Sequence, residues 1–505
     1  MKILLIHPNK YAQRYVSIGI GMLSAVLKEH AHNVVLFDTS RFKEIDEDKS
    51  NQQTKKMEEI LQFIHTDLPP IEKSNEPVME ALHSKIQSFN PKLIGFTATS
   101  SDFSYLTSIV KQIRSYNIPI IVGGAHATVV PLETLAVEGI DMVCVGEGEA
   151  AILELVESME SGKNRTDIKN IYFKKDNQII KNELRPYVDL NNLPFLDLSI
   201  FDKYHHIGPY QGKKVIYGRF ETARGCPYKC SYCINEKLHS LYKYEKRHVR
   251  FKSPERIIAE LKDGIKKNGF NIFRFVDETF TATPYDRLVE FIRLYRSEIN
   301  KPMIIATRPE NVNEKNMRAI RDAHENIQVT MGIESGSERI RRNICNRNMS
   351  NNTIVKAFHI CSDLGYLTAS FNMIGLPDET RADFLETVQV NRDARVDQPM
   401  LSYFYPFPGT KLRDYCIQKG YINNTLHEVD YAVSSVLNMA QFTKDEIEGL
   451  KRTFVLYVKM NDSFFPEIQK AEQDDNIFNK LVKIYNEKYF YKRAVIKPKL
   501  EESYC

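Results

Sequence analysis

Short apolar runs separated by polar loops mark the first third of the chain. Five runs lie at residues 2–6, 34–37, 92–96, 119–122 and 142–145, and the stretches 18–27 and 105–116 carry apolar residues at helical spacing. Each run has the length and composition of a parallel strand that is buried on both faces. Strand, loop and helix repeated in this order predict an open, doubly wound α/β sheet of the flavodoxin or Rossmann type, whose ligands bind across the carboxyl ends of the strands.

Two stretches depart from this pattern. Residues 41–90 begin with a dense run of charged and polar side chains between Arg41 and Lys56, and this predicts an exposed insertion. Residues 168–173 and 178–180 are two short strand-like segments around a polar turn, which indicates a hairpin. We therefore expect a first domain at residues 1–162, with a charged insertion at about 41–90, and a linker at residues 163–210.

The alternation of strands and helices restarts after residue 211. Strands are predicted at residues 215–222, 271–276, 303–307, 328–332, 368–374 and 400–405, with helices such as 254–267 and 285–297 between them. Six strand–helix units suggest a partial (β/α)6 barrel at residues 211–420, with functional residues directly after the strands. Residues 421–505 are expected to be helical, because Thr443 and Glu446 form a capping pattern before helically spaced apolar residues.

Composition narrows the classes of protein further. The 505 residues carry a net charge of +4 with no dense Lys and Arg block, so nothing indicates a nucleic-acid partner. No apolar run reaches the roughly eighteen residues that a membrane-spanning helix needs. Five of the eight cysteines share no spacing and are expected to be ordinary reduced thiols of a cytoplasmic protein: Cys144, Cys345, Cys361, Cys416 and Cys505.

The remaining three cysteines form a compact motif. Cys226, Cys230 and Cys233 follow one another at Cys-x3-Cys-x2-Cys spacing. Three thiolates from one loop can hold three irons of a cubane [4Fe–4S] cluster and leave the fourth iron open. An open coordination position is typical of catalytic metal sites. Zinc is the alternative, since His239 is close enough in sequence to supply a fourth ligand.

This motif, with Tyr232 directly before its last cysteine, resembles the signature of the radical S-adenosylmethionine (radical SAM) superfamily. The resemblance implies that the open iron chelates the amino and carboxylate groups of SAM, and that an electron from the cluster splits SAM into methionine and a 5′-deoxyadenosyl radical. The protein then orients the cofactors and shields the radical.

Residues that follow the predicted strands resemble the SAM-binding positions of that family. Asp277 and Glu278 follow the second strand, where a carboxylate can accept charge-assisted hydrogen bonds from an ammonium group. Arg308 follows the third strand, and Glu334 and Ser335 lie in Gly-Ile-Glu-Ser-Gly after the fourth. The resemblance assigns Glu334 to the ribose or the amino group of SAM and Ser335 to the carboxylate. Asp378, by contrast, is expected to be only a helix N-cap.

The loops of the first domain resemble the cobalamin-binding domain that precedes many radical SAM enzymes. The matching pieces are His7-Pro8, the turn at 18–21, Thr97, Thr99 and Ser100 in the segment 97–101, Gly123, Gly124 and His126 in the segment 123–128, and Gly146 and Glu147 in the segment 146–149. Paired glycines permit close approach of the backbone to a bulky ligand, and short hydroxyls can bind its tail. The Asp-x-His-x-x-Gly motif that places a histidine under cobalt is absent, so we expect neither His7 nor His126 to ligate the metal.

Together the two resemblances imply a cobalamin-dependent radical SAM enzyme that uses a [4Fe–4S] cluster, SAM and cobalamin. The reaction they imply is methylation of an unactivated carbon of a small molecule or biosynthetic intermediate through the adenosyl radical and methylcobalamin. A non-methylating cyclase or rearrangement enzyme is the alternative, and a non-catalytic cobalamin or cluster sensor is the alternative of another class. The implied partners are a small-molecule substrate and an electron donor such as flavodoxin or ferredoxin. The C-terminal helices are expected to cover the barrel mouth or the cobalamin, or to be only structural.

Overall fold

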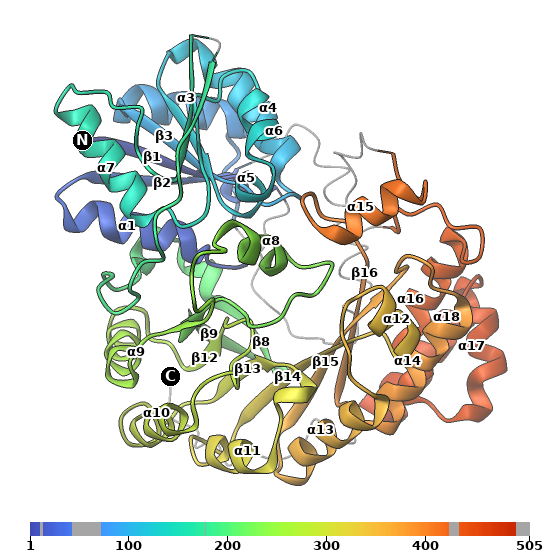
Figure 1. Ribbon diagram of the computed structural model, residues 1–505. Coiled ribbons are helices and arrows are strands. Elements are labelled where there is room, and N and C mark those ends of the chain that lie inside the picture. Colours follow the sequence, from blue (N-terminus) through green and yellow to red (C-terminus); the bar gives the residue numbers. More distant parts are fainter. Residues whose placement is uncertain (11–13, 43–71, 177, 424–433, 491–505) are drawn as a thin grey trace.

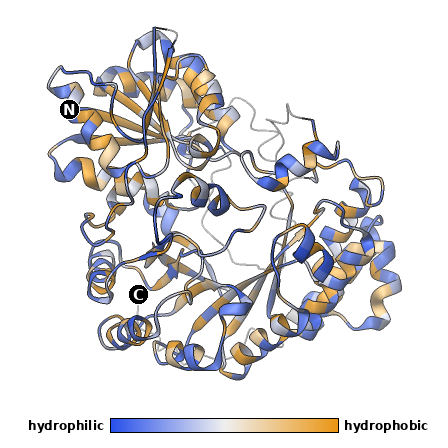
Figure 2. Cartoon of the chain, in the orientation of Figure 1, coloured by the Kyte–Doolittle hydropathy of each residue, from blue (hydrophilic) through white to orange (hydrophobic). Residues whose placement is uncertain are grey.

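The computed structural model describes residues 1–10, 14–42, 72–176, 178–423 and 434–490. Figure 1 shows two α/β units, one formed by the first third of the chain and one by residues after about 200, with α8 (Ile234–Leu241) between them. The strands of both units are mainly hydrophobic, whereas the outer faces of the helices are mainly hydrophilic (Figure 2). This pattern is that of sheets buried between helices.

The first sheet has the strand order β2-β1-β3-β4-β5-β6-β7. Its parallel strands are β1 (Lys2–His7), β2 (Asn33–Asp38), β3 (Leu93–Thr97), β4 (Ile120–Gly123) and β5 (Met142–Cys144). Side chains of β1 alternate between two cores: Ile3 and Leu5 pack in the core that contains residues of α1 (Ile18–Glu29) and α7 (Glu149–Glu160). Leu4 and Ile6 pack in the core of α3 (Val78–Phe89) and α4 (Phe103–Ile113). The doubly wound sheet predicted from the sequence is therefore present.

The predicted hairpin consists of β6 (Ile171–Lys175) and β7 (Gln178–Lys181), and it extends the first sheet by antiparallel pairing with β5. The charged segment between Arg41 and Lys56 lies almost wholly outside the described residues. The prediction of an exposed insertion is wrong for its last part, residues 78–89. Residues 78–89 form α3, whose Val78, Leu82 and Ile86 are buried in the core, because their apolar spacing matches one helix face.

The second sheet has the order β16-β15-β14-β13-β12-β9-β8 and curls into a half-barrel (Figure 1). Its parallel strands are β9 (Lys213–Phe220), β12 (Ile272–Phe275), β13 (Met303–Thr307), β14 (Ile327–Glu334), β15 (Leu367–Ile374) and β16 (Gln398–Tyr403), and β8 (Ile207–Tyr210) is antiparallel at the edge. All six predicted strands are found. The sheet's convex face is covered by α9 (Pro254–Asn268), α10 (Tyr285–Glu298), α11 (Glu314–Arg321), α13 (Asn351–Asp363) and α14 (Arg381–Asp393).

The C-terminal helices lie at the side of the half-barrel. Thr443 and Glu446 form the predicted capping box of α16 (Lys444–Lys459), and this helix packs against α14 and β16. α17 (Phe465–Ala471) and α18 (Asp475–Tyr485) pack in turn on α16. Their apolar faces continue the outer helix layer at the side of the half-barrel (Figure 1), as the purely structural alternative implies. A role in covering the barrel mouth or the cobalamin stays a prediction.

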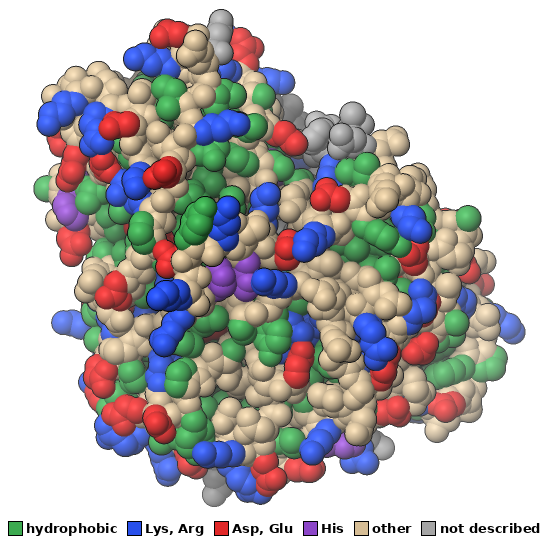
Figure 3. Space-filling view, viewed as in Figure 1, with side chains coloured by type: hydrophobic (Ala, Val, Ile, Leu, Met, Phe, Trp, Pro, Cys, Tyr) green, Lys and Arg blue, Asp and Glu red, His purple; other side chains and the backbone are tan. Residues whose placement is uncertain are grey.

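The boundaries drawn at residues 162, 210 and 420 remain predictions. Within the described part of the chain, no helix combines the length and apolarity required to traverse a bilayer. Lys and Arg side chains alternate with Asp and Glu side chains over the face seen in Figure 3. That mixture agrees with the small net charge of +4.

Candidate active site

The cysteine motif occupies the loop between β10 (Ala223–Arg224) and α8. Cys226 and Cys230 are buried, and Cys233, the N-cap position of α8, is half-buried. Burial raises the pKa of both Cys226 and Cys233. Deprotonated thiols in such a position need a compensating positive partner, and a bound metal centre supplies one.

Each of the three sulfurs has a hydrogen-bond partner from a different part of the fold. Cys226 Sγ lies 3.8 Å from the Thr279 hydroxyl, Cys230 Sγ accepts from Arg308 Nη1 at 3.0 Å, and Cys233 Sγ accepts from Asn235 Nδ2 at 3.5 Å. Hydrogen bonds to the coordinating sulfurs are a principal means by which proteins tune iron–sulfur clusters. The donor set therefore fits a cluster held by these three cysteines.

His239 does not join the cysteines as a fourth ligand. Its Nε2 lies 2.7 Å from the Cys226 carbonyl oxygen, and its ring stacks on His248 with centroids 3.9 Å apart. Among the described residues, no three or more His, Cys, Asp or Glu side chains gather closely enough for one metal ion. A cubane binds each thiolate through a separate iron, so it accommodates sulfurs that do not converge on one point.

Arg308 connects the cysteine loop to the end of β13. Its guanidinium also binds Glu310 and lies over the Tyr228 ring, 3.7 Å from the centroid. Burial and Arg347 lower the pKa of Arg308, but Glu310 and Cys230 outweigh them and raise it overall. Arg308 is therefore a fixed positive charge beside the sulfur of Cys230.

Arg347 organises a second network that the sequence did not reveal. Its Nη1 donates to the Tyr232 hydroxyl at 3.1 Å and to Glu334 Oε1 at 2.8 Å, and its Nη2 donates to the Gly332 carbonyl at 2.7 Å. Glu334 has φ of +66°, and its side chain folds back over Gly332, where a Cβ atom would not fit. Such strained backbone often marks functional sites. A lone arginine between unrelated residues carries no sequence signal.

Asp277 and Glu278, which follow β12, lie in different environments. Asp277 is buried, and its carboxylate accepts hydrogen bonds from the Thr222 amide at 3.0 Å and the Thr222 hydroxyl at 2.9 Å. Burial raises its pKa to about 7. Glu278 is exposed. Ser335 is fully buried, and its hydroxyl accepts from the Ser337 amide. Glu278, rather than Asp277 or Ser335, is thus the group of these three that a ligand can reach.

The predicted cobalamin-binding residues lie at the carboxyl edge of the first sheet. Thr97 ends β3, Gly123 ends β4, and Thr99 is exposed in the loop beyond β3. Gly124 has φ of +97°, and a Cβ atom there would lie 2.8 Å from the Ala98 carbonyl oxygen. The glycine is required by close packing of two loops of the protein, not solely by the approach of a ligand.

Both histidines of this edge are held by protein contacts. His126 is 3% exposed, its Nδ1 lies 3.0 Å from the Ser100 hydroxyl, and its ring stacks on Phe103. His7 is also buried, with Nδ1 3.7 Å from an oxygen of Asp38.

Gly146 and Glu147 connect the two units of the fold. The Glu147 carboxylate forms ion pairs with Arg224 and Arg250, and its amide donates to the Tyr242 hydroxyl at 3.1 Å. The Tyr242 hydroxyl also occupies the space where a Cβ atom of Gly146 would lie. These residues clamp the first domain to the strands and helix that flank the cysteine loop. The assignment of Gly146 and Glu147 to cobalamin stays a prediction.

Asp378 is not the N-cap that the sequence suggested. Its carboxylate accepts hydrogen bonds from the hydroxyls of Tyr415 and Tyr421. The N-cap of α14 is Thr380, which forms a capping box with Asp383. The N-cap of α14 lies two residues later than expected. Asp378 therefore contacts α15 (Lys411–Gln418), which contains Tyr415, and the residues that follow this helix.

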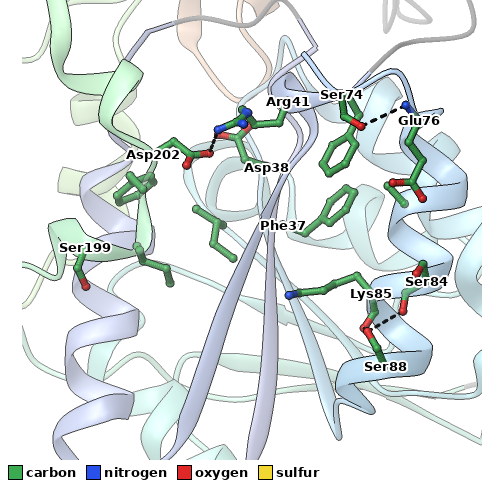
Figure 4. Close-up of a pocket in the computed structure, with 15 residues that line it drawn as sticks. Phe37, Asp38, Arg41, Ser74, Glu76, Ser84, Lys85, Ser88, Ser199 and Asp202 are labelled. Atoms are coloured by element: carbon green, nitrogen blue, oxygen red, sulfur yellow. Dashed lines mark hydrogen bonds and ion pairs between the residues drawn. The ribbon is translucent and has the colours of Figure 1, made fainter. Parts of the chain in front are cut away.

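A cavity of about 520 Å³ lies beside the edge strand β2, away from the cysteine loop (Figure 4). Asp38 and Arg41 line it on one side and Ser84 and Lys85 of α3 on the other. None of the predicted cofactor-binding residues lines this cavity.

Two family models match the chain. The B12 binding domain matches residues 8–156, and the Radical SAM superfamily matches residues 220–390. An uncharacterised methyltransferase of Pyrococcus horikoshii is 29% identical over 73% of this chain and 78% of its own length. The anaerobic magnesium-protoporphyrin IX monomethyl ester cyclase of Rubrivivax gelatinosus is 24% identical over 82% of this chain and 69% of its own.

Solved structures share the fold. The radical SAM methyltransferase TsrM from Kitasatospora setae, with cobalamin and a [4Fe–4S] cluster bound, has a TM-score of 0.62 and 14% identity over 83% of this chain and 75% of its own. The cobalamin-dependent radical enzyme OxsB, with aqua-cobalamin and SAM bound, has a TM-score of 0.64 and 15% identity over 96% and 70%. With both family models matched in order along it, this chain belongs to the radical SAM enzymes that carry a B12-binding domain.

Proposed function

We propose that this protein is a cobalamin-dependent radical SAM methyltransferase that acts on an unactivated carbon of a small molecule. One arrangement carries the proposal. The three cysteine sulfurs each have their own hydrogen-bond partner, and the loop that holds them is clamped to the B12-binding domain through Arg224 and Glu147. A cluster on this loop and a cobalamin at the edge of the first sheet would then share one reaction space.

When bound, the cluster with SAM supplies a 5′-deoxyadenosyl radical, and cobalamin supplies a transferable methyl group. Cys226, Cys230 and Cys233 hold the cluster. Glu278, which is exposed beside the loop, is suited to accept hydrogen bonds from the ammonium group of SAM.

Tyr232 and Glu334 lie at the border of the proposed SAM-binding region. Arg347 holds both side chains in place through hydrogen bonds of 3.1 and 2.8 Å. Because Arg347 neutralises Glu334, the carboxylate can accept a hydrogen bond from a ribose hydroxyl without carrying an unpaired buried charge. We assign Glu334 to the ribose and Arg347 to positioning it.

The first domain presents hydroxyls and backbone groups at the carboxyl ends of β3 and β4, from Thr97, Thr99, Ser100 and Gly123. Ligands of doubly wound sheets bind at this edge. We propose that these residues hold cobalamin.

The relative from Rubrivivax gelatinosus favours a second candidate, a cyclisation that transfers no methyl group. The two candidates differ in their products. A methylation that consumes two SAM molecules forms 5′-deoxyadenosine and S-adenosylhomocysteine in equal amounts, whereas a cyclisation forms no S-adenosylhomocysteine.

The test uses the full chain, reconstituted anaerobically with iron, sulfide and cobalamin and reduced chemically in place of the flavodoxin or ferredoxin that we propose as the electron donor. In the wild type we expect about four irons per chain and both products from SAM. The triple variant Cys226→Ala, Cys230→Ala, Cys233→Ala should lose this iron and should form no 5′-deoxyadenosine. Cys361→Ala, which removes a buried thiol of α13, is the matched control and should retain the iron. Formation of 5′-deoxyadenosine without S-adenosylhomocysteine would favour the cyclase. Bound zinc without iron would exclude both.

A further inference from the structure

Two arginines lie side by side on the concave face of the half-barrel. Arg219 of β9 and Arg274 of β12 are register partners in adjacent parallel strands. Their neighbours Phe220 and Phe275 point to the opposite, helix-covered face, where Phe275 contacts Phe291 of α10. Because successive residues of a strand alternate between faces, both guanidinium groups extend from the concave face.

Neither guanidinium has an anionic partner in the described chain. Arg219 donates to the carbonyl oxygens of His205 at 2.9 Å and Arg14 at 3.1 Å. Arg274, which is half-buried, forms neither a hydrogen bond nor an ion pair with any described residue. Glu221, the residue that directly follows β9, is engaged by Arg224 at 2.8 Å.

Two like charges directly opposite one another destabilise a sheet. Burial and Arg274 lower the pKa of Arg219 to about 10, so the group still carries its proton at neutral pH. The fold therefore maintains two adjacent positive charges at a cost. An anion that accepts hydrogen bonds from both guanidiniums would remove this cost, and arginine pairs suit carboxylates and phosphates in particular.

The same face bears apolar side chains that remain in contact with solvent. Val276, two residues beyond Arg274, is 39% exposed, and on the far strands Phe371 and Met400 are 39% and 37% exposed. Phe371 and Met400 are register partners of β15 and β16. Phe371 lies on the inner strand β15, where side chains of a parallel sheet are normally buried on both faces. Together with Met400 on the edge strand β16 and Val276 directly after β12, it forms an exposed apolar surface that indicates a place for a ligand.

We propose that the substrate is an anionic molecule with an apolar body. Its carboxylate or phosphate group binds Arg219 and Arg274, and its apolar part lies against Val276, Phe371 and Met400. The assignment rests on the proposed function in that it places a substrate on the barrel face, but anion binding at this face can be measured without any turnover.

The test measures binding of octyl phosphate, octanoate, octanol and octylamine to the full reconstituted chain by calorimetry. These probes share one apolar chain and differ in charge. We expect the two anions to bind at least about tenfold more tightly than octanol, as one charge-assisted hydrogen bond implies. Added salt should weaken their binding. Arg274→Gln should abolish the preference for anions, Arg274→Lys should retain part of it, and Arg296→Gln on the exposed face of α10 should change nothing.

Equal binding of octyl phosphate, octanol and octylamine to the wild type would overturn the proposal, and this outcome does not depend on how any variant folds. So would an unchanged preference in Arg274→Gln. The nucleotide phosphate of cobalamin is the other anion that this pair could hold. Cobinamide lacks that phosphate, so weaker binding of cobalamin but not of cobinamide to Arg274→Gln would assign the arginines to the cofactor and also refute the proposal. Loss of SAM cleavage with intact anion binding would instead contradict only the proposed function.

Discussion

Arg308 donates a hydrogen bond from Nη1 to the sulfur of Cys230 across 3.0 Å, and this links the end of β13 to the middle of the cysteine loop. The guanidinium is held in place by Glu310 and by the ring of Tyr228. A fixed cation beside one coordinating sulfur stabilises the more negative, reduced form of a cluster, because the added electron is partly compensated.

Arg308→Gln should therefore lower the midpoint potential of the cluster by about 60 mV or more, the shift that corresponds to a tenfold change in a one-electron equilibrium. Arg308→Lys should lower it less. The measurement is a redox titration followed by electron paramagnetic resonance, with Arg318→Gln on the surface of α11 as the control. An unchanged potential at full iron content would show that this hydrogen bond does not tune the cluster.

Gly124→Ala should destabilise the first domain and weaken cobalamin binding together. At φ of +97° a Cβ atom is strained, and here it would also lie 2.8 Å from the Ala98 carbonyl oxygen. Gly162→Ala is the matched control, because Gly162 has φ of +71° but nothing within 4 Å of its Cβ position. Thermal unfolding and cobalamin retention should both fall further in Gly124→Ala, and equal losses in the two variants would show that strain alone matters.

Asp277 should make the protein less stable as the pH rises from about 4 to about 7. Its folded-state pKa is raised to about 7 by burial, so over that range the folded state binds a proton that the unfolded state has released. The linked loss of stability is at most about 4 kcal/mol. Melting temperatures measured at pH 5 and pH 7.5 should differ less in Asp277→Asn than in the wild type. The same pH dependence in both proteins would show that this carboxyl does not titrate in the window.

Neither His7 nor His126 is expected to ligate cobalt. His126 is enclosed by Ser100 and Phe103, and His7 faces Asp38. We predict that the nucleotide base of bound cobalamin is detached from cobalt as well. Cob(II)alamin added to the protein should then show no nitrogen superhyperfine splitting in electron paramagnetic resonance. A splitting that disappears in His126→Ala would identify His126 as the lower ligand and contradict the prediction.

Local sequence patterns were sufficient for most of the elements and for the cysteine loop, although α3 was missed inside the expected insertion. Apolar runs of strand length and helical spacing depend on nearby residues alone, so both sheets and the capping box at Thr443 could be predicted. The spacing of Cys226, Cys230 and Cys233 is likewise local. It indicates an iron–sulfur loop independently of the fold.

Only the tertiary structure decided which side chains meet. Arg347 joins Tyr232 to Glu334, and Arg219 lies beside Arg274, because strands and loops distant in sequence are adjacent in the sheet. Asp277 and Glu278 are neighbours in the chain, yet one is buried beneath Thr222 and the other is exposed. Sequence determined the elements because secondary structure follows from short-range periodicity. The site depended on long-range packing, which assigns each polar side chain either a partner within the protein or a position facing a ligand.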